Sequence, residues 1–173
     1  MIIGKPLFTT EQINDKVMEL AERISRDYAG KEVLAVGVLK GSFMFFADLI
    51  RALRIPVSVD FIISSSYVKT DSSGKTSIYY DVRENIRGRD VLLIDDIIDT
   101  GISLNIIRES LLSKGPASLR ICVLLDKEER RVTRVPVDYI GFRIPNQFVV
   151  GYGLDYENKY RNLPYIALFK KER

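Results

Sequence analysis

Two adjacent acidic residues, Asp95 and Asp96, end an apolar run and are followed by a small turn that contains two hydroxyl groups. The stretch reads VLLIDDIIDTGISL, residues 91–104, and its turn is Thr100-Gly101-Ile102-Ser103. Carboxylates suit sugar hydroxyls or a hydrated magnesium ion, whereas backbone N–H groups at a helix start suit a phosphate. Neighbouring strand residues point to opposite faces, so we expect the two carboxylates to hold different parts of one ligand. The segment therefore offers sites for the parts of a phosphorylated sugar.

A structural interpretation of the same stretch stays open, in which Asp99 or Thr100 only caps a helix and the acidic pair is solvated. Phosphoacceptor receiver domains also place paired carboxylates at a strand end. In those domains the pair lies near the start of the chain, and no phosphate-binding turn follows. The chain has no histidine, so any proton transfer must fall to carboxylates, lysine, tyrosine or water.

Length and composition indicate one globular domain, residues 1–173. Hydrophobic residues make up 46% and charged residues 28%, and a net charge of +3 is too small to argue for nucleic acid or a membrane. No apolar run approaches the roughly 18 residues that span a bilayer. The N-terminal MIIGKPLFTTEQ lacks the apolar core of a signal peptide, so we expect a cytoplasmic protein. Cys122, inside ICVLL, is expected to be a buried apolar residue.

The elements that must position these residues alternate between apolar strands and helices, which predicts an α/β fold with a mainly parallel sheet. Ligands of such sheets bind at the carboxyl ends of the strands. We expect strands at 33–39, 57–64, 91–94, 119–125, 137–144, 148–150 and 165–169. We expect helices from a capping box at Thr9 and Gln12 to Gly30, over 43–54 and over 103–115.

The first predicted helix should bury Ile13, Val17, Leu20 and Ile24, which recur at helical intervals. The third should bury a face made of Ile102, Ile106 or Ile107, and Ser110 or Leu111. Residues 64–80 are polar and rich in serine, and a loop of this length inside a compact domain is either functional or disordered.

The thirteen residues VLLIDDIIDTGIS resemble the phosphoribosyl-pyrophosphate motif of type I phosphoribosyltransferases. The resemblance implies a twisted, mainly parallel sheet flanked by helices, with a core of roughly residues 30–142 and a small hood formed by the chain termini. It also implies that Asp95 and Asp96 hold the ribose and magnesium. The implied 5′-phosphate site consists of Asp99, Thr100, Gly101, Ile102 and Ser103.

Other segments resemble the hypoxanthine-guanine branch of this family. Leu39-Lys40-Gly41 resembles its pyrophosphate loop, in which the bond before the lysine is cis. Ser66-Tyr67 resembles the lid that closes over the reacting centre, and Asp99 occupies the position of the carboxylate that accepts a proton near N7 of the base. Two departures are small: some relatives have Glu at Asp95 and a second Gly at Ser42.

The base-binding residues are also implied by resemblance. Lys127 resembles the lysine that donates to the 6-oxo group, and FVVGYGLDYENKYRNLPYI, residues 148–166, resembles the base-binding stretch. There, Phe148 stacks on the purine, the Val149 backbone reads its edge, Asp155 orients a second magnesium ion, and Arg161 contacts pyrophosphate.

Each of these residues also has a plainer interpretation. Lys40 would be an exposed turn residue, the lid a mobile loop, and Phe148 a core aromatic. The residues after Lys127 were predicted as solvated, namely Glu128, Glu129 and Arg130. Arg131 was predicted to reach pyrophosphate or a neighbouring subunit.

The resemblance implies purine salvage: transfer of the 5-phosphoribosyl group from phosphoribosyl pyrophosphate to N9 of a 6-oxopurine, with magnesium, by a homodimer or homotetramer that binds no nucleic acid. One alternative is an RNA-binding regulator of the pyrimidine-synthesis type on the same fold, and another is a transferase that prefers adenine or xanthine. The RNA alternative depends on a basic cluster that acidic residues interrupt: Arg120, Lys127, Arg130, Arg131 and Arg134.

Overall fold

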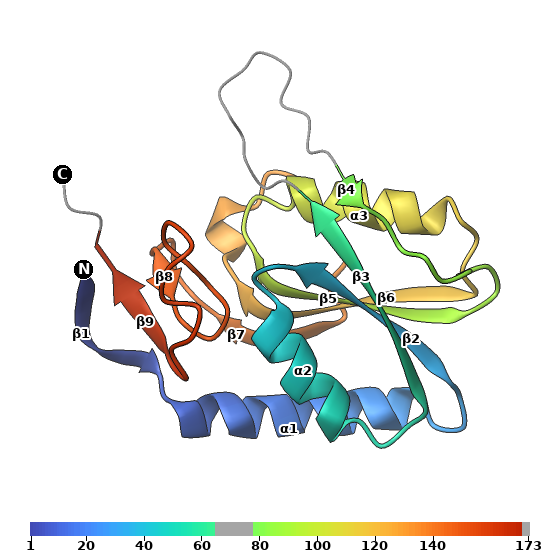
Figure 1. Ribbon diagram of the computed structural model, residues 1–173, viewed down its shortest axis with the longest axis horizontal. Helices are drawn as coiled ribbons and strands as arrows, with labels where there is room; N and C mark the ends of the chain where they lie inside the picture. Colours follow the sequence, from blue (N-terminus) through green and yellow to red (C-terminus); the bar gives the residue numbers. More distant parts are fainter. Residues whose placement is uncertain (65–77, 171–173) are drawn as a thin grey trace, which may run out of the picture.

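The computed structural model of the chain describes residues 1–64 and 78–170. Its central sheet contains β2 (Val33–Leu39), β3 (Val57–Ser64), β4 (Ile78–Tyr80), β5 (Asp90–Ile98), β6 (Ser118–Asp126) and β7 (Tyr139–Arg143). The strand order is β4-β3-β2-β5-β6-β7. All neighbouring pairs are parallel except β3 with the edge strand β4. The predicted mainly parallel α/β sheet is thus confirmed (Figure 1).

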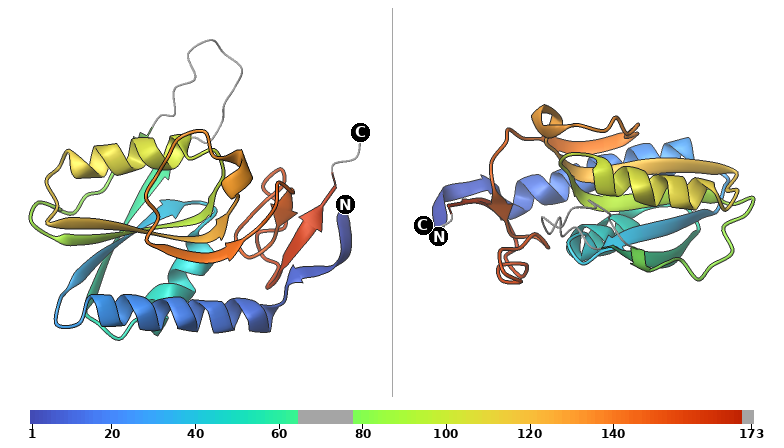
Figure 2. Two further views of the ribbon diagram at one scale, coloured as in Figure 1. Left: turned by 180° about the vertical axis from the view of Figure 1, so that it is seen from behind. Right: turned by 90° about the horizontal axis from the view of Figure 1, so that it is seen from above.

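Helices cover both faces of this sheet (Figures 1 and 2). On one face lie α1 (Thr10–Asp27) and α2 (Phe43–Ala52), and on the other lies α3 (Ile102–Leu112). The predicted capping box is present, because Gln12 N–H donates to Thr9 Oγ1 at 3.3 Å and Thr9 N–H donates to Gln12 Oε1 at 2.9 Å. Among the described residues, no helix is both long enough and apolar enough to cross a bilayer.

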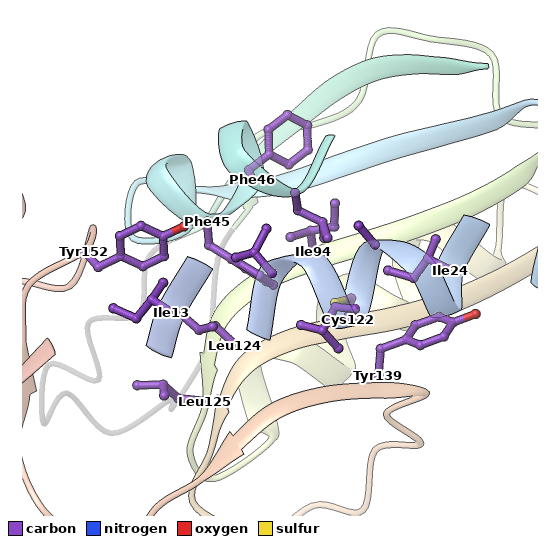
Figure 3. Close-up of a cluster of buried hydrophobic side chains, with 14 of the residues drawn as sticks. Ile13, Ile24, Phe45, Phe46, Ile94, Cys122, Leu124, Leu125, Tyr139 and Tyr152 are labelled. Atoms are coloured by element: carbon purple, nitrogen blue, oxygen red, sulfur yellow. The ribbon is translucent and has the colours of Figure 1, made fainter. Parts of the chain in front are cut away.

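The larger hydrophobic core lies between α1, α2 and the sheet (Figure 3). The helical spacing of α1 buries Ile13, Leu20 and Ile24 completely, as the sequence predicts. Each such side chain stabilises the fold by about 1.5–3 kcal/mol relative to leaving it in water. Cys122 on β6 is also fully buried, and this burial raises the pKa of its thiol, so the group is inert as predicted.

The buried face of α3 agrees with the prediction at Ile107 and Leu111 and differs at its first position. Leu104, Ile107 and Leu111 are buried against the second core, whereas Ile102 is 38% exposed. The helix also ends at Leu112 rather than at residue 115. The turn before α3 directs the side chain of its first residue, Ile102, outward. The buried residues then follow at intervals of three and four, starting from Leu104.

Strand β5 is longer than predicted, because it continues through the acidic pair to Ile98. Its ladder with β6 runs on to the pair Ile98 and Asp126, whereas its ladder with β2 ends at Gly37 and Ile94. The acidic residues therefore lie on a part of β5 that is paired on one side only.

A second sheet joins the two ends of the chain. It consists of β1 (Ile2–Phe8), β9 (Ile166–Phe169) and β8 (Val149–Val150), in that order. Met1 and Lys170 lie side by side at its edge, since Lys170 N–H donates to the Met1 carbonyl at 3.0 Å. Strand β1 was not predicted, because most of its residues are exposed and it lacks an apolar run.

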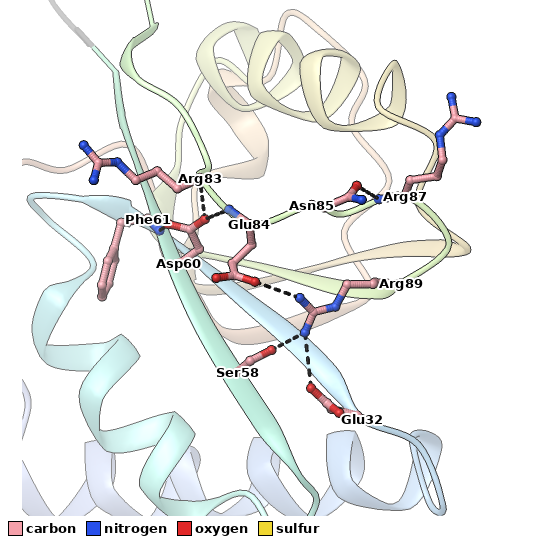
Figure 4. Close-up of polar contacts among 9 residues, drawn as sticks. All are labelled: Glu32, Ser58, Asp60, Phe61, Arg83, Glu84, Asn85, Arg87 and Arg89. Atoms are coloured by element: carbon pink, nitrogen blue, oxygen red, sulfur yellow. Dashed lines mark hydrogen bonds and ion pairs between the residues drawn. The ribbon is translucent and has the colours of Figure 1, made fainter.

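The segment that leads into β5 is fixed to β3 by a buried carboxylate (Figure 4). Asp60 is only 8% exposed, and its Oδ2 accepts the backbone N–H groups of Arg83 and Glu84 at 2.7 and 2.8 Å. Arg89 forms ion pairs with Glu32 and Glu84, both at 3.2 Å. These contacts fix the chain immediately before the strand that carries Asp95 and Asp96.

Candidate active site

Three loops meet at the carboxyl edge of the central sheet, because β2, β5 and β6 are adjacent and parallel. They comprise residues 39–41 after β2, residues 95–103 at the end of β5, and residues 126–133 after β6. We call these three loops together the floor. The three-stranded sheet and the irregular segment 151–163 are called the hood (Figure 1).

Asp95 and Asp96 are half-buried at the centre of the floor. Each carboxylate accepts a hydrogen bond from the backbone N–H of the residue that follows it. Asp95 Oδ1 accepts Asp96 N–H at 2.9 Å, and Asp96 Oδ1 accepts Ile97 N–H at 2.8 Å. Burial raises the pKa of both carboxyl groups, and repulsion by Asp96 raises that of Asp95 further. The Asp96 charge acts on the Asp95 carboxyl group at a point where β5 has already lost its β2 neighbour, since the ladder with β2 ends at Ile94.

The loop after β2 lies directly against the acidic pair. The Leu39–Lys40 peptide bond is cis, which confirms the expectation from the family resemblance. A Cβ atom on Gly41 would collide with the Asp96 carboxylate, so this close approach requires glycine. Ser42 is fully buried and its hydroxyl donates to the Val38 carbonyl at 2.6 Å, which closes the turn. Lys40 itself is exposed beside the site.

The turn after β5 has the geometry of an anion site at a helix start. Gly101 has φ of +83°, a left-handed conformation that glycine adopts without penalty, and it precedes the first residue of α3. Ile102 N–H lies 3.4 Å from Thr100 Oγ1, and Asn105 N–H donates to the Gly101 carbonyl at 2.9 Å. The amide groups and the positive end of the α3 dipole favour a negative ligand at this position.

The loop after β6 is attached to this turn along its length. Lys127 N–H donates to the Ile98 carbonyl, and the N–H groups of Val132 and Thr133 both donate to the Thr100 carbonyl, each at 3.0 Å. A Cβ on Gly101 would lie 2.8 Å from Arg131 Cδ and would also collide with the Thr133 carbonyl. The turn and the loop that carries Lys127 therefore form one connected unit.

Arg131 lies within this unit. Its guanidinium pairs with the buried Asp126 carboxylate, and its Nε donates to the Asp99 carbonyl at 3.2 Å. In this structure Arg131 contacts residues of the turn and of its own loop. The sequence predicted a contact with pyrophosphate or with another subunit.

Asp99 and Lys127, the predicted proton acceptor and oxo-group donor, are electrostatic neighbours. Lys127 is only 7% exposed, and burial lowers the pKa of its ammonium group while the Asp99 charge acts in the opposite direction. Arg130 Nε lies 2.7 Å from Asp99 Oδ1. Arg130 is exposed, as predicted for a solvated residue, and it also forms this ion pair with Asp99. Residues 128–130 form a 3-10 turn in which the Arg130 N–H donates to the Lys127 carbonyl at 3.0 Å.

The predicted base-binding residues begin the hood. Phe148 is 39% exposed, with its ring edge-on to Tyr156 at 6.0 Å and tilted to Phe169 at 6.0 Å. Val149 is buried and pairs with Leu168 on β9. Phe148 is therefore a partly exposed aromatic held in an aromatic cluster, not a core residue, which leaves part of its surface available to a planar ligand.

Asp155 and Arg161 lie on the segment between β8 and β9 and form an ion pair of 2.9 Å. Arg161 Nη1 also donates to the Gly153 carbonyl at 2.7 Å. Gly153 touches the floor, since a Cβ there would collide with the Gly41 carbonyl. The Arg161 charge acts on Asp96 and opposes the upward shift of its pKa. The hood thus places a cation near the acidic pair.

The described residues contain no group of three or more acids, cysteines or histidines that could hold a metal. Asp95 and Asp96 adjoin each other, whereas Asp155 is engaged by Arg161 and by Asn158 N–H at 2.7 Å. The acidic pair still suits a hydrated divalent cation, because two desolvated carboxylates that repel each other gain from a positive ion between them. The predicted lid residues Ser66 and Tyr67 lie outside the described residues.

Comparison with known proteins gives consistent matches over nearly the full chain. A model of the phosphoribosyl transferase domain matches residues 6–157. A Streptococcus thermophilus protein named hypoxanthine-guanine phosphoribosyltransferase is 46% identical over 171 residues, which cover 98% of this chain and 95% of that protein.

Solved structures are similar over the same extent. A crystal structure of a hypoxanthine-guanine phosphoribosyltransferase from Bacillus anthracis matches with a TM-score of 0.90 and 45% identity, covering 97% of this chain and 99% of that chain. A hypoxanthine phosphoribosyltransferase from Staphylococcus aureus matches with a TM-score of 0.92 and 45% identity, covering 97% and 92%.

Proposed function

The chain belongs to the phosphoribosyl transferase family, and we propose that it transfers the 5-phosphoribosyl group of phosphoribosyl pyrophosphate to N9 of a 6-oxopurine, hypoxanthine or guanine. One observation carries the proposal. An acidic pair, an anion-binding turn and a buried lysine beside a carboxylate meet at one sheet edge. The reaction releases pyrophosphate with inversion at the anomeric carbon.

In this proposal the floor binds the sugar phosphate. The 5′-phosphate lies on the amide groups of residues 100–103, and Asp95 and Asp96 face the ribose hydroxyls. The contact of Gly41 with Asp96 supports this arrangement, because it brings the pyrophosphate loop next to the acidic pair. One small ligand can then contact both. The turn at residues 100–103 is held in place, since backbone hydrogen bonds join it and the end of β5 to the loop after β6.

Departure of pyrophosphate is the demanding step, because a highly charged group leaves while positive charge builds on the ribose. We assign its stabilisation to the Lys40 backbone, Gly41 and Arg161. Arg161 reaches over the floor from the hood, and its effect on the Asp96 pKa supports this placement. Asp95 and Asp96 supply negative charge near the developing cation.

The base binds between floor and hood. Phe148 stacks on the purine, the Val149 backbone reads its edge, and Lys127 donates to the 6-oxo group. As N9 bonds to the anomeric carbon, the N7–H bond breaks and the proton passes to Asp99. Burial of Lys127 strengthens the selection, because a buried donor left without an oxo group costs free energy.

Magnesium is the cofactor that the donor set fits. Asp95 and Asp96 would hold it with water and substrate oxygens, and Asp155 would orient a second ion. When bound, magnesium neutralises pyrophosphate charge as the leaving group departs. A cytoplasmic location and self-association as a dimer or tetramer accompany this proposal as expectations from the family.

The RNA-binding alternative receives less support. The relatives named above carry the transferase name. Several cations of the basic cluster are paired within the fold: Arg120 with Asp27 at 3.0 Å, Arg130 with Asp99, and Arg131 with Asp126. Such cations do not form an open surface for a phosphate backbone.

The test is pyrophosphate release from phosphoribosyl pyrophosphate with hypoxanthine, guanine, xanthine, adenine or uracil, each with and without magnesium. We expect release only with magnesium and fastest with hypoxanthine or guanine. Release with uracil alone, or none with any base together with steeply salt-dependent RNA binding, would contradict the proposal.

A further inference from the structure

The contact between Arg130 and Asp99 is not used by the reaction described above. Arg130 Nε lies 2.7 Å from Asp99 Oδ1, with the two side chains 44% and 39% exposed. An exposed ion pair of this kind contributes little to stability, typically about 0–1 kcal/mol. A stability role therefore does not explain why the cation is placed on this carboxylate.

The two oxygens of Asp99 have different surroundings. Oδ1 is shielded from solvent and accepts no hydrogen bond within the described part of the chain, so the Arg130 guanidinium is what compensates its charge. The Asp99 side chain as a whole is 39% exposed, so its exposed part lies away from Oδ1. One oxygen is thus shielded and held by a cation, while the rest of the side chain remains open to solvent.

Arg130 is itself fixed by the loop that carries Lys127. Its N–H donates to the Lys127 carbonyl at 3.0 Å, and its Nη1 lies 3.4 Å from Asn146 Oδ1. Lys127 and Arg130 are therefore two cations from one short turn beside a single carboxylate. Among the described residues Arg130 forms an ion pair with Asp99, whereas no ion pair joins Lys127 to this carboxylate.

We propose that Arg130 is a positioning residue for the transfer: it holds Oδ1 of Asp99 so that Oδ2 is directed at the purine, and it keeps Lys127 from pairing with Asp99. In the reaction, the N7–H bond breaks, the proton bonds to Oδ2, and the electron pair stays on the purine as N9 attacks. Arg130 touches neither substrate. This inference rests on the proposed function and adds a residue to it.

A double-mutant cycle tests the inference. The variants are Arg130→Gln, Arg130→Lys, Asp99→Asn and the Asp99→Asn/Arg130→Gln pair, with Arg134→Gln as the control, since Arg134 is an exposed arginine of the same segment. For each variant, kcat and both KM values are measured for phosphoribosyl pyrophosphate and hypoxanthine. Thermal unfolding of each variant is recorded alongside.

We expect Arg130→Gln to lower kcat roughly ten- to a hundredfold, because misplacing a reacting group by about 1 Å has that effect, while KM for phosphoribosyl pyrophosphate changes less than about twofold. Arg130→Lys should recover part of the loss. In the Asp99→Asn background, Arg130→Gln should cost less than about twofold, because a residue that acts through Asp99 has nothing left to position.

An Arg130→Gln variant that matches Arg134→Gln would overturn the inference, as would an equal loss in both backgrounds. If Arg130→Gln does not fold, the same cycle is run with Arg130→Lys, and a loss that is equal with and without Asp99→Asn has the same consequence. Wild-type protein without turnover would instead contradict the proposed function, so the two failures are distinguishable.

Discussion

The floor and the hood are built in different ways. The floor follows three adjacent parallel strands, and its turn is fixed by backbone hydrogen bonds of 3.0 Å from the neighbouring loop. In the hood, β8 and β9 have only two and four residues, and the long connection between them contains four non-glycine residues with positive φ: Tyr152, Glu157, Asn158 and Tyr160. The ribose and its 5′-phosphate are assigned to the regular region, and stacking of the base is assigned to the irregular one.

This difference suggests that substitutions in the floor and the hood affect different substrates. A regular sheet edge holds charges within a narrow geometry, which transfer of an activated sugar requires. An irregular segment can change shape by substitution without disturbing the sheet. We therefore expect variants of Asp99 and of the turn in the floor to lose turnover or sugar-phosphate binding, and variants of Phe148 in the hood to lose base binding.

The largest effect is expected at Asp99. Replacing Asp99 by Asn keeps its shape but removes the proton acceptor, which should lower kcat by roughly 10²–10⁴ and leave both KM values within a few-fold. Steady-state kinetics measures this. Asp15→Asn, an exposed change on α1, is the matched control. Near-normal turnover of Asp99→Asn would remove Asp99 from the mechanism.

The next largest effect is expected for Gly101→Ala. At φ of +83°, with a Cβ directed at Arg131 Cδ and the Thr133 carbonyl, alanine should cost about 1–3 kcal/mol of stability. We expect affinity for phosphoribosyl pyrophosphate to fall by more than about tenfold as the amide groups move, by calorimetric titration. Gly30→Ala is the control, because Gly30 has φ of +76° but open space around it. Equal affinity in the two variants would show that the turn does not bind the phosphate.

Phe148→Ala tests the hood. Loss of one aromatic stacking partner should raise KM for hypoxanthine roughly tenfold, because stacking on a base contributes about 1–3 kcal/mol. The KM for phosphoribosyl pyrophosphate should change little, and Phe148→Tyr, which keeps the ring, should behave like the wild type. Parallel increases in both KM values would mean that floor and hood do not divide the substrates.

The smallest effect concerns pH. Burial lowers the pKa of Lys127, so its charge is lost at lower pH than that of an exposed lysine. The KM for hypoxanthine should therefore rise by on the order of threefold per pH unit once pH exceeds this lowered pKa, below the usual lysine range. The Lys127→Arg variant keeps its positive charge over this pH range, so its pH profile reports only the ionisation of the purine. Identical profiles for the two proteins would exclude Lys127 as the titrating donor.

The sequence was most informative where the structure is local. The acidic pair and the turn at residues 95–103 are contiguous, and a strand that meets a helix start constrains both, so their arrangement could be predicted. The phase of α3 could not, because it depends on the left-handed conformation of Gly101. The Arg130 contact with Asp99 depends on the loop after β6 folding over that after β5, and no local pattern encodes such a contact.

A sequence motif of the hood could be identified, but the secondary structure of the hood was harder to predict. Strand β1 pairs with β9 from the other end of the chain, and its exposed residues gave no apolar periodicity. The stretch 148–166 was identified only through its resemblance to a family. The contact of Gly153 with the Gly41 carbonyl joins two segments more than a hundred residues apart in the sequence.

The most direct measurement is a crystal structure of the protein with phosphoribosyl pyrophosphate and magnesium. We predict that the 5′-phosphate will accept hydrogen bonds from the amides of residues 100–103, with the ribose hydroxyls facing Asp95 and Asp96. Binding of the sugar phosphate at any other surface, with this sheet edge empty, would contradict the account.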